Sequence, residues 1–232
     1  MIDTKIDSIR EAVMDTFPIA VGVIPFGITC GIMGLTSGLS AFETILMSLL
    51  VFAGAAQFIS IAMLGAGVTG WGIIVVTTLL VNLRHLIMGA SLAPYLLKEK
   101  LPFQALLAFG LTDESYAITI NKIEKSGYNP WYQLAVHIFL YLAWAFSTIV
   151  GVYLVRHISD PLKWEIDFII PASFLVLLVP RLINKTSLLV CGISALTAVA
   201  GNLFLPGKWY IILACILGSL MGVAYERSIK HA

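Results

Sequence analysis

The sequence predicts an all-α integral membrane protein, a polytopic bundle of seven or eight transmembrane helices, some of them broken. Of its 232 residues, 59% are hydrophobic and only 12% are charged, and the mean hydropathy is +0.95. Soluble domains are about half apolar and about a quarter charged, so the shortage of charge is the stronger signal. The apolar residues also form runs of about 20, the length at which a helix crosses a hydrocarbon core of about 30 Å.

Most expected spans are continuous apolar runs. Residues 102–121 are ambiguous, because the apolar stretch LPFQALLAFGL is followed by TDES within the same window. This segment is either an eighth span that carries buried acids or a re-entrant segment, so the count is seven or eight. The expected spans are 17–36, 41–66, 69–92, 132–155, 168–180, 187–205 and 209–225.

The first 16 residues predict an amphipathic helix that lies at the membrane interface. Ile2, Ile6, Ile9 and Val13 recur every three or four residues between acidic positions, which places them on one helix face. A frayed tail is the alternative. The segment lacks the basic start and short apolar core of a cleaved signal peptide. We therefore expect an interfacial helix over 1–16, a single transmembrane domain over 17–226 and a C-terminal tail over 227–232.

The charges exclude some partners and suggest an orientation. Lysine plus arginine (14) nearly balance aspartate plus glutamate (13), and no charge run indicates a nucleic-acid partner. The three cysteines form no cluster, so we expect no metal, disulfide or cofactor. With eight spans, the side that holds both termini has eight basic residues against five, with Lys98 and Lys100 among the five. This bias favours cytoplasmic termini, and a seven-span count would break the parity.

Two similar spacings suggest an internal repeat. Pro25 precedes Ala53-Gly54 by 28 residues, and Pro171 precedes Ala200-Gly201 by 29 residues. Repeated halves with matching broken helices are the architecture of many secondary transporters. Chance agreement is the alternative, since the chain has 19 glycines.

Arg84 and His85 are ionisable residues inside an apolar run, LLVNLRHLIMGASLAP. A charged side chain at mid-helix costs roughly 2.5–3.5 kcal/mol on insertion scales, so Arg84 needs an acid, a carbonyl, water or a ligand carboxylate. The planar guanidinium suits bidentate carboxylate binding, and Asn82 adds a neutral donor and acceptor. The alternative is a structural ion pair with an acid on another helix.

Asp113 and Glu114 form a second polar cluster, within TDESY. Adjacent carboxylates on a helix point about 100° apart, so they cannot share one partner. One can pair with Arg84 while the other binds a proton or an ammonium group. A solvated helix end is the alternative, because Asn121 and Lys122 follow soon after. His137, on an apolar face, is more typical of a satisfied buried histidine than of a proton carrier.

Two segments predict irregular helix. FAGAAQF (52–58) places four small residues and one amide inside a long apolar run, which allows a helix to unwind where it lines a cavity. Gln57 would then contact a polar group of a ligand, whereas close packing alone explains the small residues equally well. Pro25 and Gly27 predict a break in the first span, with a plain packing kink as the alternative.

Four motifs, in this order, resemble those of the AzlC family, which are permeases associated with branched-chain amino acid export and azaleucine resistance. They fall within residues 24–117, and the hydropathy of the remainder is compatible with the same family. The motifs are IPFGI (24–28), FAGAAQF (52–58), VNLRHLIMGASLAP (81–94) and LTDESYA (111–117).

The resemblance implies a multi-pass transporter of the cell inner membrane that exports leucine, isoleucine and valine, with methionine as a further candidate. It also implies proton coupling and a small AzlD-like membrane subunit as partner. A zwitterionic amino acid needs a cation, acceptors for its ammonium group and an apolar pocket. The candidate substrate-binding residues are Arg84, Asn82, Gln57, Gly54 and Phe58, and the candidates for proton coupling or ammonium binding are Asp113, Glu114 and His85.

Other functions remain open. A passive channel or pore for small polar solutes would also need small residues and polar groups at mid-membrane. An intramembrane enzyme is not expected, because the sequence has no GxSxG or HExxH motif. A third reading makes this chain a scaffold whose partner forms most of the pathway.

Overall fold

The computed structural model describes residues 5–157, 175, 178–179, 182–204 and 209–230, and all regular elements within these ranges are helices. The described residues fall into two compact units. Unit 1 comprises residues from Met1–Ala66 and Thr78–Trp164, and unit 2 comprises residues from Gly67–Thr77 and Glu165–Ala232. The all-helical class is as predicted, and each unit is described by itself.

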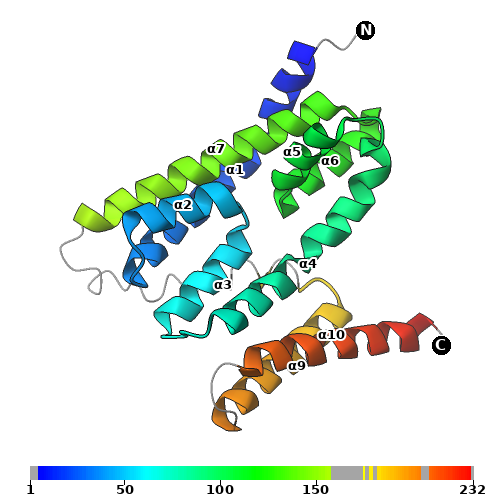
Figure 1. The fold of residues 1–232 in the computed structure, drawn as a ribbon. Helices are drawn as coiled ribbons and strands as arrows, with labels where there is room; N and C mark the ends of the chain where they lie inside the picture. The colour runs from blue at the N-terminus through cyan, green and yellow to red at the C-terminus, as the bar shows by residue number, and fades with distance from the viewer. Residues whose placement is uncertain (1–4, 158–174, 176–177, 180–181, 205–208, 231–232) are drawn as a thin grey trace. The chain divides into compact units, whose positions relative to one another are not determined.

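Unit 1 is built on two long helices, α1 (Lys5–Thr36) and α7 (Pro130–His157), which run side by side (Figure 1). Two glycines allow their backbones to touch. A Cβ at Gly31 would overlap the Thr148 carbonyl of α7, and a Cβ at Gly151 would overlap the Ile28 carbonyl of α1. Small residues at such crossings let membrane helices gain packing contacts that larger side chains would prevent.

The predicted break of the first span at Pro25 and Gly27 is wrong, because α1 continues without interruption through both residues. Pro25 has no N–H to donate to the preceding turn, and the Thr29 hydroxyl adds a hydrogen bond to the Pro25 carbonyl at 2.9 Å. Gly27 is buried, and a Cβ there would overlap Ser147 of α7. The glycine therefore serves helix packing.

The expected span over 41–66 is two short helices, α2 (Ala41–Val51) and α3 (Gly54–Gly65). Ser40 caps α2, because its hydroxyl accepts from the Glu43 N–H while the Glu43 carboxylate accepts from the Ser40 N–H. Phe52 then takes a left-handed conformation, and the chain turns back. A Cβ at Gly65, at the end of α3, would meet the Ser37 side chain. Both arms of this first hairpin therefore end at the same end of unit 1.

A second hairpin follows α4 (Trp71–Leu96), whose residues from Thr78 onward belong to unit 1. Its arms are α5 (Leu101–Phe109) and α6 (Asp113–Ser126), which Figure 1 shows beside each other. Thr112 and Ser115 form a capping box that starts α6. The stretch predicted as either an eighth span or a re-entrant segment is therefore a broken pair of helices.

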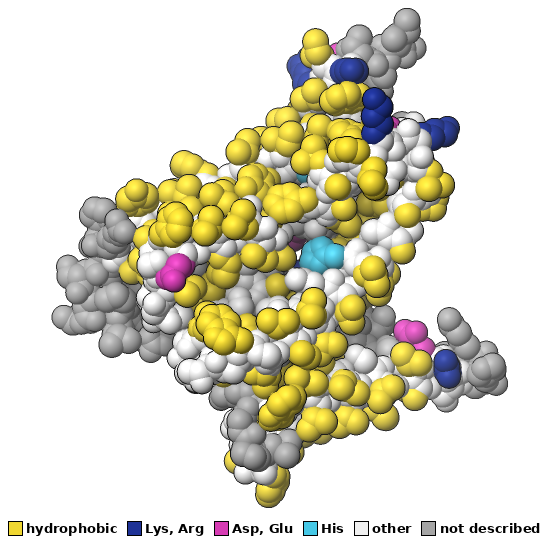
Figure 2. Space-filling model, in the orientation of Figure 1, with side chains coloured by type: hydrophobic (Ala, Val, Ile, Leu, Met, Phe, Trp, Pro, Cys, Tyr) yellow, Lys and Arg dark blue, Asp and Glu magenta, His cyan; other side chains and the backbone are white. Residues whose placement is uncertain are grey.

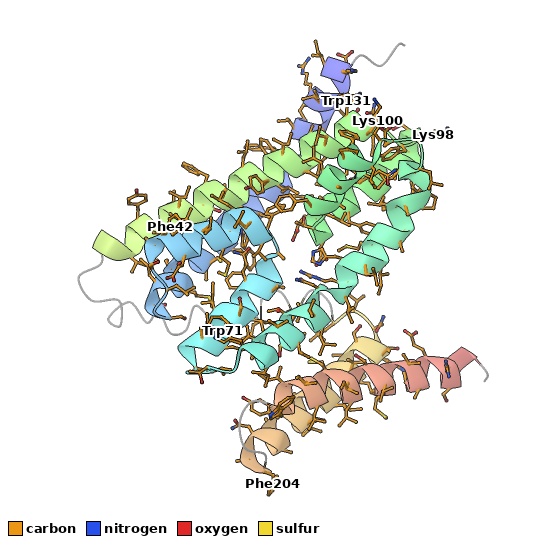
Figure 3. The ribbon with its side chains drawn as sticks, in the orientation of Figure 1. Phe42, Trp71, Lys98, Lys100, Trp131 and Phe204 are labelled. Carbon is orange, nitrogen blue, oxygen red and sulfur yellow. The ribbon has the colours of Figure 1, made fainter. Side chains whose placement is uncertain are left out.

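One end of unit 1 gathers the helix N-termini of α1, α5 and α7. Lys5 lies over the Trp131 ring at 4.3 Å, and the rings of Phe103 and Trp131 are 5.8 Å apart. Figure 3 shows Lys98, Lys100 and Trp131 at this end. Because Lys98 and Lys100 lie at the same end as the start of α1, the predicted split of basic residues between two sides was wrong for these two lysines.

The amphipathic N-terminal stretch is the first part of α1 and not a separate helix. Its polar residues contact the beginning of α7 and the end of α6. Lys122 binds the Glu11 carboxylate at 2.6 Å, and the Tyr132 hydroxyl donates to Asp15 at 2.6 Å. Its placement at a membrane interface stays a prediction.

Unit 2 contains α9 (Lys185–Phe204) and α10 (Trp209–Lys230), which lie side by side (Figure 1). The Ser194 hydroxyl of α9 donates to the Ala214 carbonyl of α10 at 3.2 Å. Most of the predicted span 168–180 lies outside the described residues. The internal repeat is not confirmed: Ala53-Gly54 stands at a helix start, Ala200-Gly201 lies within α9, and Pro171 is outside the described residues.

Five of the described helices are long and apolar enough to cross a membrane, namely α1, α4, α7, α9 and α10. The predicted count of seven or eight is not confirmed, because two of the expected spans are hairpins of short helices. Figure 2 shows hydrophobic side chains over most of the drawn face, with charged side chains in a few places. Exposed large apolar residues such as Phe42, Leu86, Ile87 and Phe146 fit contact with lipid.

Candidate functional site at the tips of two helical hairpins

The tips of the two hairpins meet against the middle of α7. The Phe52 ring of the first tip lies 6.3 Å from the Phe109 ring of the second. Tyr141 of α7 contacts both, at 5.0 Å from Phe52 and 6.0 Å from Phe109, and its hydroxyl donates to the Leu49 carbonyl at 2.9 Å. Helix breaks in a membrane protein occur where backbone is buried in protein or lines a cavity. The meeting point is thus the first place to look for a site.

An ion pair stands at the second tip. Arg84 Nη1 of α4 lies 2.5 Å from Asp113 Oδ2, the first residue of α6. Both side chains are partly buried, with 33% and 22% of their surface exposed. The guanidinium is not fully used, since Arg84 Nε is buried and has no hydrogen-bond partner. Glu114 forms no ion pair with a described residue.

The polar neighbours of Arg84 belong to the same stretch of α4. The Nδ1 atom of His85 lies 3.3 Å from the Asn82 carbonyl, and the Asn82 side-chain oxygen is buried without a partner. Both residues are half-buried. The three polar residues of the VNLRH motif are therefore partly shielded, and two of them hold unused hydrogen-bonding atoms.

A buried polar chain supports the first tip. Gln57, in the first turn of α3, has no exposed surface, and its Nε2 donates to the Ser48 hydroxyl at 2.9 Å. Ser48 in turn donates to the Thr148 hydroxyl of α7 at 3.1 Å. The same Nε2 lies 3.8 Å from the Cys30 sulfur of α1. This chain joins four helices, and nothing in the sequence pattern marked Ser48, Thr148 or Cys30 as part of it.

Phe58 and Gly54 pack against Trp144 of α7. The Phe58 and Trp144 rings meet edge to face at 6.2 Å, and a Cβ at Gly54 would stand 3.1 Å from the indole. Trp144 is an addition to the predicted residues. Helical spacing could have found it, because His137, Tyr141, Trp144 and Thr148 recur every three or four residues on one face of α7.

His137 is buried, with 3% of its surface exposed, but both ring nitrogens lack a partner. The prediction of a satisfied histidine was therefore wrong. The ring occupies the space that a side chain at Gly110 would take, just before the second tip. Only glycine at position 110 leaves room for the imidazole.

Unsatisfied polar atoms concentrate at the two tips and on the helices beside them. Native proteins pair most buried polar side-chain atoms, so each exception needs an explanation. Among the described residues, seven buried side-chain atoms have no partner, and all but that of Thr77 belong to residues of this site. These residues are Gln57, Asn82, Arg84, His137 and Trp144.

The fold and the site together define a class, the helical membrane proteins in which broken helices bring polar groups to the middle of an apolar bundle. Comparison with known proteins gives the family. A family profile described as "AzlC protein" matches residues 18–158, more than half of the chain, and the chain belongs to this family.

Three relatives show how widely the similarity extends. An uncharacterized membrane protein of Archaeoglobus fulgidus is 35% identical over 179 residues, 75% of each chain. The inner membrane protein YgaZ of Escherichia coli is 29% identical over 89% of this chain and 86% of its own. The branched-chain amino acid transport protein AzlC of Bacillus subtilis is 28% identical over 92% of this chain and 83% of its own. No solved structure gave a significant match.

Proposed function

We propose that this chain is a secondary transporter that exports leucine, isoleucine and valine, with methionine as a further substrate, across the cell inner membrane. The observation that carries the proposal is the group of unpaired buried polar atoms around the Arg84–Asp113 pair in a chain of the AzlC family. A relative named for branched-chain amino acid transport supports the same substrate class.

Each part of the substrate has a candidate partner. Arg84 and Asn82 offer donors for the carboxylate, Gln57 offers an acceptor, and Gly54 and Phe58 border an apolar surface with the rings at the tips. An apolar pocket separates aliphatic side chains poorly, by about 1–3 kcal/mol for each methylene. Overlapping specificity for the four amino acids is therefore expected.

The two acids divide the remaining roles. Asp113 neutralises Arg84, and Glu114, without an ion-pair partner among the described residues, binds the substrate ammonium or a proton. Protonation of Glu114 weakens its hold on the ammonium group, which couples substrate release to proton entry. His85, beside Arg84, is a second candidate for proton coupling. A small AzlD-like membrane subunit completes the transporter.

The test is efflux of labelled leucine, valine and methionine from cells that lack their own exporters. Efflux should saturate, require the partner subunit and fall when a protonophore is added. Glu114→Gln should abolish the effect of the protonophore, whereas Glu124→Gln, on the exposed side of the same helix, should leave efflux unchanged.

Three results would contradict the proposal. Flux that neither saturates nor responds to the protonophore would identify a passive channel. Full proton-driven export by the Asp113→Asn and Glu114→Gln variants would remove both acids from the mechanism. Full export by the partner without this chain would reduce the chain to a scaffold.

A further inference from the structure

Helix α3 begins without a cap. Ala53, at the capping position, has no side chain that can accept a hydrogen bond, and the first bond of the helix runs from the Gln57 N–H to the Ala53 carbonyl at 3.0 Å. The N–H groups of Gly54, Ala55 and Ala56 therefore have no acceptor among the described residues. Helix α2 begins away from the tips and helix α6 begins at the second tip. Both of these helices have capping boxes.

Trp144, which packs against Gly54, has a further unused donor. Its side chain is buried, with 6% of its surface exposed, and its Nε1–H has no acceptor. The indole lies against Gly54, the first residue of α3, at 3.1 Å from the position that a Cβ would occupy. A tryptophan N–H usually finds a partner when it is buried. The benzo edge of the ring makes this contact, and no described residue provides an acceptor for the N–H.

The backbone at this tip is strained. Phe52 has φ 43° and ψ 45°, and it is the only non-glycine residue with positive φ among those described. Left-handed conformations of bulky residues cost free energy and persist where the surrounding structure imposes them, often at binding sites. Here the strain turns the chain so that α3 starts at the tip, where Gly54 and Ala55 are partly exposed.

The unused groups at the start of α3 and on Trp144 are donors, whereas Gln57 Oε1 in the same turn is an unpaired acceptor. The dipole of α3 adds positive potential at its N-terminus. An anion satisfies such a group of donors better than a cation or a neutral acceptor. Arg84 is held by Asp113 in this conformation, so it is not free to take a carboxylate alone. The rings of Phe52, Phe58 and Tyr141 surround the tip with apolar surface. A carboxylate with an aliphatic chain fits both these donors and this apolar surface.

We propose that the N-terminus of α3 and the Trp144 indole form a carboxylate-binding subsite, which holds the substrate carboxylate while Arg84 is paired with Asp113. The inference rests on the proposed function for the identity of the natural ligand. The subsite itself binds any small aliphatic carboxylate, whether or not the chain transports amino acids.

The test is calorimetric binding to the full-length chain in lipid nanodiscs. The probes are L-leucine, 4-methylpentanoate, which keeps the carboxylate and lacks the amine, and 3-methylbutylamine, which keeps the amine and lacks the carboxylate. Sulfate serves as an inorganic anion. Trp144→Phe removes the N–H together with part of the ring, and Trp71→Phe, at an exposed tryptophan, is the matched control.

We expect Trp144→Phe to weaken the binding of leucine and 4-methylpentanoate by about tenfold, the usual effect of losing one hydrogen bond to a charged group. Trp71→Phe should change neither. Ala55→Pro, which deletes a backbone donor where the first turn of a helix tolerates proline, should act like Trp144→Phe.

The subsite is overturned if 4-methylpentanoate does not bind, if Trp144→Phe and Ala55→Pro both bind it as the unmodified chain does, or if sulfate competes equally well. Binding of 4-methylpentanoate that depends on Trp144, without binding of leucine, would keep the subsite and contradict the proposed function. Leucine binding that is unchanged in Trp144→Phe and in Ala55→Pro would contradict the subsite and keep the proposed function.

Discussion

At the scale of single residues, the Arg84–Asp113 pair is half-satisfied. One guanidinium nitrogen contacts Asp113, while Nε stays buried without an acceptor. A partly buried ion pair adds little net stability, because desolvation offsets much of its Coulomb attraction. The pair is therefore better suited to exchange partners than to hold the fold together.

The position of Asp113 depends on the residue before it. The Thr112 hydroxyl accepts from the Ser115 N–H at 3.2 Å and fixes the start of α6. Thr112→Val removes this cap and should lower the free energy of unfolding by about 1 kcal/mol. Because Asp113 then loses its fixed position against Arg84, leucine efflux should fall as well. Thermal unfolding in detergent and labelled-leucine efflux measure the two effects.

Thr112→Ser is the matched control, since it keeps the hydroxyl. It should unfold and transport like the unmodified chain. If efflux is unchanged in Thr112→Val although the unfolding temperature is lower, the cap does not position Asp113 for transport.

The sequence predicted much of this site at the residue level. It missed the residues of α7 that pack against the first tip. Arg84, Gln57 and Asp113 stood out because polar groups are costly in an apolar run. Trp144 and Thr148 did not, because such residues are ordinary in a membrane helix. Helical spacing places both on one face of α7, but their contact with the first tip appears only in the structure.

At the scale of helices, the contact between α1 and α7 depends on two glycines, Gly31 and Gly151. Gly31→Ala should lower the free energy of unfolding by about 1–3 kcal/mol, because the new methyl group would displace the α7 backbone. Gly22→Ala, in the same helix but with open space around the added methyl group, should instead stabilise the chain by about 0.4–1 kcal/mol. Thermal unfolding of both variants in detergent is the measurement.

An equal response of the two variants would show that the close approach of the helices is unimportant. Changes of opposite sign in the free energy of unfolding cannot come from helix propensity alone, because both positions lie within α1.

Hydropathy located the long helices well and misread the first hairpin. The run 41–66 is as apolar as a true span, so composition alone could not show that it turns back halfway, whereas TDES left 102–121 open between a span and a re-entrant segment. The turn at Phe52 requires a strained backbone, which residue type does not predict. The expected break at Pro25 failed for the opposite reason, since one missing hydrogen bond in a well-packed helix is tolerated.

At the scale of the whole molecule, the hairpins change the orientation argument. Because both arms of the second hairpin end where α1 begins, Lys5, Arg10, Lys98, Lys100, Lys122 and Lys125 all lie at one end of unit 1. Arg156, in the last turn of α7, is the only Lys or Arg that the described residues of unit 1 place at the other end. This bias is much stronger than the sequence alone indicated, and it predicts that the first end is cytoplasmic.

Cysteine labelling tests this orientation. Ser126→Cys, at the last residue of α6, should react with a membrane-impermeant maleimide only in permeabilised cells. Ala66→Cys, after α3 at the opposite end, should react in intact spheroplasts. Both positions are exposed. The reverse pattern would place the lysine-rich end outside the cell. Labelling of both cysteine variants in intact spheroplasts would mean that the ends of the two hairpins lie on the same side of the membrane.

The first hairpin also sets an order of events during synthesis. Its contacts with α7 join residues 92 and 100 positions apart, from Leu49 to Tyr141 and from Ser48 to Thr148. At the usual rate of about 5–20 residues per second, the ribosome needs several seconds to make that interval. During this time Gln57 and the strained turn at Phe52 have no α7 to pack against. A chain stalled before α7 therefore presents an unassembled hairpin, which membrane chaperones and proteases can recognise as unfinished.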